Sequence, residues 1–320
     1  MAETLKTTPI SPPQLTFYLL FKRTRMSRKD WGLALLVILA WGVNFVVIKQ
    51  GLDELPPMLL GALRFSLVAF PAVLFIRPPK LPLKWLLAYG ATISLGQFSL
   101  LFSAMHLGMP AGLASLVLQA QAIFTLFFAL IFLGERWHAS QVIALLIAAS
   151  GLALLALQSP DHSMTAIGFI LTIGAAASWG LGNIINRKIG QLGSVNLLSL
   201  VVWSALIPPL PFMLLSYWME GPELIISSLS HMGIKSMLAV LYLAAVATIF
   251  GYGSWAYLLK HYPASQVAPL TLMVPVVGLL TAWLALGETL NLWQAAGIAM
   301  VMLGLLVNVF GRALFKQLRR

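Results

Sequence analysis

Long apolar runs of similar length divide most of this chain. They are bounded by charges, Pro or Gly and lie near 32–51, 57–77, 83–105, 110–133, 138–157, 164–186, 196–218, 236–259, 264–286 and 291–311. An α-helix needs about 20 apolar residues to cross the hydrocarbon core of a bilayer. Lipid offers the backbone no hydrogen bonds, so a chain inside it forms helices or a closed barrel. The sequence therefore predicts an all-α integral membrane protein with ten transmembrane helices.

The composition indicates that lipid is the solvent for most of the surface. The chain is 60% hydrophobic and only 9% charged, whereas about 25% of the residues of a soluble globular protein are charged. The net charge is +11, but the basic residues stand at the ends of the apolar runs, where they orient a membrane protein. We therefore expect contacts with membrane lipid and none with nucleic acid.

The sequence shows no catalytic or metal-binding motif. There is no cysteine, which excludes a disulfide framework, a thiolate nucleophile and a Cys-ligated metal. No His-Glu-x-x-His, Gly-x-Ser-x-Gly or phosphate-loop motif occurs, and the His residues stand at span ends without acidic neighbours. We therefore expect no cofactor, no metal and no catalytic site, which argues against an enzyme.

One segment of the chain occurs twice. Residues 110–152 and 263–305 align without gaps, and ten of the 43 positions are identical, against roughly four expected by chance in so Leu-rich a chain. The rarer identities are Pro110/Pro263, Glu135/Glu288, Gln141/Gln294 and Gly151/Gly304. Each copy holds an apolar helix, a break that carries one Glu, and a second apolar helix. The chain is therefore expected to consist of two related halves.

The charges of the breaks predict the orientation. The termini and every second break carry basic residues, namely Lys22, Arg23, Arg25, Arg28, Lys29, Arg77, Lys80, Lys84, Arg136, Arg187, Lys188, Lys260, Arg312, Lys316, Arg319 and Arg320. The other breaks hold mainly Asp53, Glu54, Asp161, Glu220, Glu223 and Glu288, with Lys235 as their clearest basic residue. Because cytoplasmic loops carry the excess of Lys and Arg, both termini are expected to be cytoplasmic.

The two copies are predicted to cross the membrane in opposite directions, because the fourth and ninth spans are five spans apart. The expected units are two inverted five-helix repeats, residues 26–157 and 158–320. Inverted repeats are an architecture of secondary transporters, with the substrate site between the halves near the middle of the membrane. Alternating access uses this symmetry directly, whereas an enzyme or a receptor has no need of it.

Residues 1–25 differ from the rest of the chain. They combine a TTPISPP tract with a short apolar run that ends in KRTR. That run is too short to cross a bilayer, and no small-residue cleavage site follows it. We interpret residues 1–25 as a non-spanning extension, which is either an interfacial segment or sequence placed ahead of a start at Met26.

Polar side chains within the spans are candidates for a substrate cavity, because each needs a partner, a cavity or a ligand in lipid. Trp41 and Asn44 share a face of span one, and in span six Trp179, Asn183 and Asn186 follow at i, i+4 and i+7. The alternative for these residues is hydrogen bonding and packing between helices. Further candidates in spans three, four and eight are Gln97, Gln119, Gln121, Tyr252 and Trp255. Side chains two residues apart point about 200° apart around an α-helix, so at most one of Gln119 and Gln121 is expected to face the cavity.

Three charged residues carry specific expectations. Arg64 is the one fully charged side chain well inside a span. We expect it in the outer half of the membrane, paired with Asp53 or Glu54, and its alternative role is to bind a substrate carboxylate. Glu135 and Glu288 each stand in a break, where a carboxylate favours the N-terminal dipole of the helix that follows.

The chain resembles the EamA-type branch of the drug/metabolite transporter superfamily. The resemblance covers residues 26 to about 315 and is carried by AWGVNFVVIK, GMPAGLASLVLQAQA and the paired LGE motifs. MSRKDWGLALL, LRFSLVAFPA, FGYGSWAYLL and APLTLMVPVVGLL resemble, more closely, bacterial inner-membrane exporters of O-acetylserine and cysteine. The resemblance implies export of these amino-acid metabolites by alternating access, and it leaves room for a homodimer.

Two other functions stay open at this point. One is export of another amino acid or a drug-like amphiphile by the same fold, which the aromatic residues of the spans would also suit. The other is an intramembrane enzyme acting on lipid, which needs a buried acid, His or nucleophile that the spans lack.

Overall fold

The computed structural model describes residues 26–157 and 164–318. Ten helical segments within them are long and apolar enough to cross a membrane, namely Arg28–Gly51, Pro57–Leu74, Leu83–His106, Ala111–Leu133, Ala139–Leu157, Ala166–Leu192, Leu197–Met219, Ile234–His261, Ala264–Leu286 and Leu292–Gly311. The predicted all-α fold with ten spans is confirmed. The extension 1–25 lies outside the described residues, as does the predicted division between the halves at 157/158.

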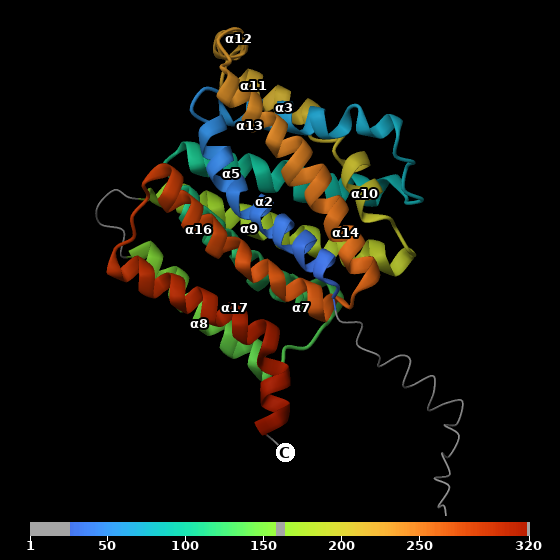
Figure 1. The fold of residues 1–320 in the computed structure, drawn as a ribbon, viewed down its shortest axis with the longest axis vertical. Helices are drawn as coiled ribbons and strands as arrows, with labels where there is room; N and C mark the ends of the chain where they lie inside the picture. Colours follow the sequence, from blue (N-terminus) through green and yellow to red (C-terminus); the bar gives the residue numbers. More distant parts are fainter. Residues whose placement is uncertain (1–25, 158–163, 319–320) are drawn as a thin grey trace, which may run out of the picture.

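Several spans consist of more than one helical element (Figure 1). Their order is α2 (Arg28–Gly51), α3 (Pro57–Ala69) with η1 (Ala72–Leu74), α4 (Leu83–Tyr89) with η2 (Gly90–Gly96) and α5 (Gln97–His106), α6 (Ala111–Val117) with η3 (Leu118–Ala120) and α7 (Gln121–Leu133), α8 (Ala139–Leu157), α9 (Ala166–Leu192), α10 (Leu197–Ser204) with α11 (Pro209–Met219), α12 (Pro222–Ser230), α13 (Ile234–Leu241) with η4 (Tyr242–Phe250) and α14 (Gly251–His261), α15 (Ala264–Val267) with η5 (Ala268–Leu272) and α16 (Met273–Leu286), and α17 (Leu292–Leu318). The short α12 fills the longest break between spans and is not itself a span.

Hydrogen bonds between the breaks show which span ends lie together. At one end the Tyr262 hydroxyl donates to Asp30, Ser199 donates to the Arg77 carbonyl, and Arg187 pairs with Glu135. At the other end the Gly233 amide donates to Glu54, the Met58 amide to Glu220 and the Ala111 amide to Glu288. Successive spans therefore alternate in direction. We call these the basic end and the acidic end, after the charges of their breaks.

The residues shared by the two copies perform the same local task in each. Gly134 and Gly287 both adopt left-handed backbone conformations, with φ of 65° and 68°, and end α7 and α16. This conformation favours glycine. The side chains of Gln141 and Gln294 then accept the amides of His138 and Asn291, three residues earlier. The repeat seen in the sequence is therefore a repeat of helix-ending and helix-starting geometry.

Irregular helix also recurs at equivalent places. Span three contains the π-helical η2, and span eight contains the π-helical η4. Spans four and nine contain the 3-10 elements η3 and η5. Such departures from α-helix rotate the side chains that follow and often occur at functional sites. In this chain all four elements adjoin the central cavity described below.

Small residues let neighbouring helices approach closely. A Cβ on Gly182 of α9 would lie 2.3 Å from Ile93, and Ser178 one turn earlier donates to the Thr92 carbonyl. In the α8 and α17 pair, a Cβ on Gly151 would lie 2.7 Å from the Gly297 carbonyl oxygen. Figure 1 shows α8 and α17 side by side along one edge of the bundle. The glycines at 151 and 304 therefore recur because each sits where two helix backbones meet.

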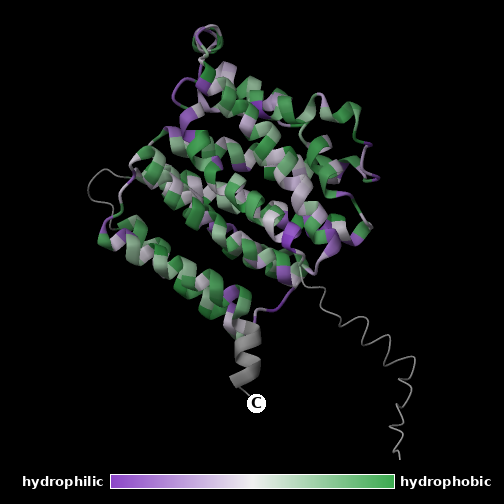
Figure 2. Ribbon diagram, viewed as in Figure 1, coloured by the Kyte–Doolittle hydropathy of each residue, from purple (hydrophilic) through white to green (hydrophobic). Residues whose placement is uncertain are grey.

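The outer faces of the spans are apolar (Figure 2). Large side chains such as Leu36 of α2, Ile170 of α9 and Trp283 of α16 are about half or more exposed. A soluble protein rarely shows contiguous apolar surface on this scale. The polar residues gather at the two ends and in the interior, as expected for a bundle surrounded by lipid.

Candidate substrate cavity

A cavity of about 270 Å³ lies inside the bundle. All ten residues that the sequence nominated line it, namely Trp41, Asn44, Arg64, Gln97, Gln119, Gln121, Trp179, Asn183, Tyr252 and Trp255. They come from spans one, two, three, four, six and eight. Both copies of the repeat thus contribute to one cavity, as expected for a site between inverted halves.

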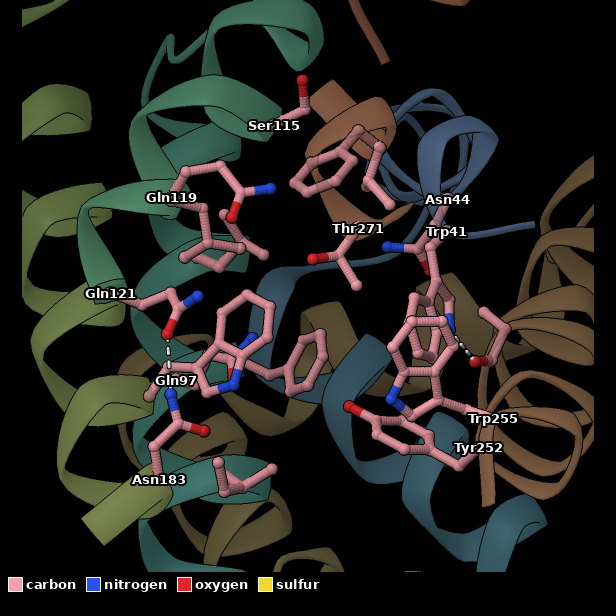
Figure 3. Close-up of a pocket in the computed structure, with 18 of the residues that line it drawn as sticks. Trp41, Asn44, Gln97, Ser115, Gln119, Gln121, Asn183, Tyr252, Trp255 and Thr271 are labelled. Atoms are coloured by element: carbon pink, nitrogen blue, oxygen red, sulfur yellow. Dashed lines mark hydrogen bonds between the residues drawn. The ribbon is translucent and has the colours of Figure 1, made fainter. Parts of the chain in front are cut away.

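One wall of the cavity is aromatic (Figure 3). The ring of Trp41 lies 5.4 Å from that of Tyr252 and 5.3 Å from that of Trp255, measured between centroids. The Trp41 indole Nε1 donates to the Ala247 carbonyl at 2.9 Å. A Cβ on Gly251 would lie 2.5 Å from this Nε1, so glycine at 251 makes room for the indole. The wall therefore joins span one of the first half to span eight of the second.

The opposite wall carries amides. Asn183 Nδ2 donates to Gln121 Oε1 at 2.6 Å and to Thr125 Oγ1 at 3.0 Å. The Thr125 hydroxyl donates to the Gln121 carbonyl at 2.7 Å, which fixes its orientation. Asn183 thus lines the cavity and also joins span six to span four by hydrogen bonds. The cavity role and the interhelical role, which the sequence left as alternatives, coincide in this residue.

The prediction that at most one of Gln119 and Gln121 faces the cavity was wrong. Both side chains line it, and Figure 3 shows them along the same wall. The reason is the 3-10 element η3, Leu118–Ala120, which runs between them. At three residues per turn, positions two apart are separated by about 120° on the helix, compared with about 160° on an α-helix.

The predicted partners of Arg64 were also wrong. Its side chain is 3% exposed and lies inside the bundle. Nη2 donates to Thr248 Oγ1 at 3.1 Å, and the guanidinium carbon lies 4.1 Å from the centre of the Phe98 ring. Glu54, the expected partner, accepts the Gly233 amide instead. Arg64 lies inside because α3 is buried on nearly all sides, and the ring of the neighbouring Phe65 stacks on Phe212 of α11.

Two side chains leave polar atoms without partners in this cavity. The Nε and Nη1 atoms of Arg64 and the Oδ1 atom of Asn44 are buried and make no hydrogen bond with residues 26–157 or 164–318. Buried polar atoms in native proteins are nearly always hydrogen-bonded, so an exception needs a physical explanation. Asn183, which follows Trp179 by four residues as Asn44 follows Trp41 by three, has its partners in span four. The two asparagines therefore have different surroundings although each closely follows a Trp-Gly pair.

Several lining residues were missed by the sequence reasoning, among them Tyr89, Ser115 and Thr271. The sequence around Ser115 does not predict a place in the cavity, because a Ser among small residues usually indicates close packing of helices. Tyr89 and Thr271 belong to no motif of the sequence. Thr271 lies in the 3-10 element η5, and such an element leaves no pattern in a single sequence. Asn186 also lines the cavity, at the i+7 position that the sequence had noted.

The cavity opens toward the basic end of the bundle. Its lining includes Asn186 and Leu259, which are exposed and stand near the ends of spans six and eight. Toward the acidic end, Ala111 and Ala114 at the start of span four are fully buried. The Glu288 carboxylate accepts the amides of Ala111 and Gly112 there, at 2.7 and 2.9 Å.

The partners predicted for the two glutamates were therefore wrong. Glu288 caps α6 in the other half of the chain instead of the helix that follows it. Glu135 bonds Arg187 at the end of α9, at 3.0 Å. A dipole argument identifies the kind of partner that a carboxylate favours, but the helix that supplies it depends on tertiary packing.

Within residues 26–157 and 164–318, no group of three or more His, Asp or Glu residues is placed to hold a metal ion. The lining of the cavity is composed of aromatic, amide, hydroxyl and apolar side chains, with Arg64 as its charged member. Such a surface can bind a small polar molecule by hydrogen bonds and ring contacts.

The known proteins that resemble this chain match it across both halves. The model of the EamA-like transporter family matches residues 31–157 and 166–310. A probable amino-acid metabolite efflux pump of Salmonella typhimurium is 54% identical over 288 residues, which are 89% of this chain and 96% of that protein. A protein of the same description from Escherichia coli K12 is 51% identical over the same shares.

A solved crystal structure matches the fold with a TM-score of 0.60 at 19% identity, covering 89% of this chain and 98% of that one. The family match and the relatives identify a multi-pass membrane transporter and not an enzyme. With both halves matched by the family model, this chain belongs to the EamA-like transporter family.

Proposed function

We propose that this protein exports small amino-acid metabolites, with O-acetylserine and cysteine as its substrates, across a bacterial inner membrane. The observation that carries the proposal is the single cavity lined by polar and aromatic residues from both copies of the repeat. Relatives at 51% and 54% identity are described as probable amino-acid metabolite efflux pumps, which supports this substrate class.

The proposed mechanism is alternating access between two inverted units, residues 26–157 and 158–320. The basic end, which carries Arg136 and Arg187, faces the cytoplasm by the positive-inside rule, and so do both termini. In this conformation the cavity opens toward that end, so substrate enters from the cytoplasm. Rocking of one unit against the other then closes the basic end and opens the acidic end.

The aromatic wall favours a second candidate substrate, a drug-like amphiphile. Trp41, Tyr252 and Trp255 form a cluster of rings that an apolar group could contact. The amide wall opposite offers several hydrogen bonds, which suit a compact polar molecule better. Amino-acid metabolites therefore remain the proposal, and the amphiphile is the competitor in the test.

Inverted membrane vesicles test the proposal. Vesicles from cells with and without the protein are given labelled O-acetylserine, labelled cysteine or a labelled cationic amphiphile. We expect uptake of O-acetylserine and cysteine above the level of the control vesicles. Uptake of the amphiphile alone would assign the competing function, and uptake of neither class would overturn the proposed substrates.

A further inference from the structure

Buried atoms without hydrogen-bond partners point to what the cavity holds. Among the described residues, the buried side-chain nitrogen and oxygen atoms that lack a partner belong to Asn44, Arg64 and Ser236. Two of these three residues line the same cavity. They offer complementary chemistry: Arg64 presents unused N–H donors and a positive charge, and Asn44 presents an unused oxygen acceptor.

We infer that Arg64 binds the carboxylate of the substrate and that Asn44 Oδ1 accepts a hydrogen bond from its ammonium group. The cavity would thus recognise the part that all α-amino acids share. This inference rests on the proposed function, since it names the atoms by which an amino-acid metabolite is held.

The charges of the lining favour an anionic group at Arg64. The cavity is lined by no Asp or Glu, and Arg64 forms no ion pair with the described part of the chain. A buried cation without a counter-ion is costly, and water can satisfy its donors without neutralising its charge. A carboxylate can do both, because its two oxygens accept paired N–H donors from a guanidinium.

The ammonium group would find its partners on span one. Asn44 stands one helical turn from Trp41 on span one, and Figure 3 shows the two close together. A carbonyl oxygen and the faces of aromatic rings both attract an ammonium group. An acidic residue would hold that group more tightly, and tight holding opposes release at the far side of the membrane.

The test is a binding titration with the full chain purified in detergent, followed by calorimetry. The ligands are O-acetylserine, its methyl ester, which lacks the carboxylate charge, and its N-acetyl derivative, which lacks the ammonium charge. Wild-type protein should bind the free amino acid roughly 10- to 150-fold more tightly than the ester, which corresponds to about 1.5–3 kcal/mol at 1.4 kcal/mol per tenfold. Arg64→Gln should abolish this preference, and Asn44→Ala should reduce the preference over the N-acetyl derivative.

Control variants separate binding from folding. Lys49→Gln removes a cation of span one that does not line the cavity, and it should leave both preferences unchanged. If Arg64→Gln protein fails to fold, Thr248→Ala removes a hydrogen bond that orients the guanidinium and should weaken the preference for the free acid. A folded Arg64→Gln protein that keeps the wild-type preference would overturn this inference and leave the proposed function standing. Binding of none of these ligands nor of cysteine would overturn both.

A second inference comes from the unequal ends of the bundle. Glu288 caps the start of span four at the acidic end, with Ala111 and Gly112 as donors. The repeat relates Glu135 to Glu288 and the start of span nine, Ala264 and Ser265, to that of span four. Here Glu135 bonds Arg187 instead, and Ala264 and Ser265 are exposed. The cap is therefore present at the closed end and absent at the open end.

We propose that the two caps alternate during transport. When the basic end closes, Glu135 leaves Arg187 and accepts the amides of Ala264 and Ser265, while Glu288 releases span four. The ion pair with Arg187 is suited to such an exchange, because its side chains are 47% and 52% exposed and an exposed pair contributes little stability.

Single cysteines can report the two ends, because the natural chain has none. The reporter is Ala114→Cys, which is buried next to the Glu288 cap and reacts with a maleimide only when the acidic end opens. Glu288→Gln should raise its labelling rate roughly 2- to 30-fold, the fold-change that corresponds to a cap of about 0.5–2 kcal/mol at 1.4 kcal/mol per tenfold. Glu135→Gln should lower the rate, because it removes a contact of the state that is open at the acidic end.

Arg187→Gln distinguishes the exchange from a simple ion pair. It frees Glu135 to cap span nine, so it should raise Ala114→Cys labelling, opposite in sign to Glu135→Gln. If Glu135 serves only the ion pair, both variants would raise labelling, and the exchange would be excluded. Glu223→Gln, an exposed acidic residue of α12, should change nothing.

Discussion

The hydrogen bonds of Asn183 predict that the two matched asparagines differ in their effect on stability. Asn183→Ala removes bonds of 2.6 and 3.0 Å to Gln121 and Thr125. Side-chain hydrogen bonds inside membrane proteins average about 0.6 kcal/mol and reach about 1.7 kcal/mol. Losing two of them should therefore lower the free energy of unfolding by about 1–3 kcal/mol. Asn44→Ala removes an oxygen that has no partner, so it should cost less than about 0.5 kcal/mol.

Reversible unfolding in mixed micelles with increasing SDS measures these free energies. A double-mutant cycle of Asn183→Ala with Gln121→Ala isolates the bond between the two side chains. Its coupling energy should lie near 0.6–1.7 kcal/mol. Equal loss of stability in Asn44→Ala and Asn183→Ala, or a coupling energy of zero, would refute the assignment of a structural bond to Asn183 and an unfilled ligand position to Asn44.

Three further predictions concern packing, topology and energy coupling. Gly151→Ala should lower the thermal unfolding temperature by several degrees, because its Cβ would lie 2.7 and 2.8 Å from backbone atoms of α17, whereas Gly190→Ala, with nothing within 4 Å, should not. Reporter fusions after Arg136 and after Arg320 should both give a cytoplasmic signal, and a periplasmic signal at either would refute the assignment of the basic end. Because Asp, Glu and His are missing from the cavity lining, efflux from substrate-loaded proteoliposomes should continue after a protonophore collapses the proton gradient, and accumulation driven by an imposed pH difference would contradict this.

The span positions and the repeat could be predicted because they depend on local chemistry. Apolar length determines a span, and the glycines and glutamines of the repeat determine how helices end and begin. Pro263, Gly287 and Gln294 need the same backbone geometry as their copies, so this signal survives in one sequence. The polar residues of the cavity were found for a related reason, since lipid leaves few other places for them.

The surroundings of individual side chains could not be predicted in the same way. Arg64 was expected to pair with Asp53 or Glu54, but it is buried in the bundle and its hydrogen bond goes to Thr248. Gln119 and Gln121 share a wall because of a short 3-10 element, which a single sequence does not indicate. Glu288 caps a helix from the other half, a contact between residues 177 positions apart. Each of these outcomes depends on long-range packing.

A structure determined with O-acetylserine bound would test the central claim most directly. We predict density for the ligand between Arg64 and Asn44, with its carboxylate within hydrogen-bond distance of the guanidinium and its ammonium group near Asn44 Oδ1. The acetyl group should lie against the wall formed by Trp41, Tyr252 and Trp255. Density at another place, or an empty cavity at a concentration that saturates transport, would contradict the account.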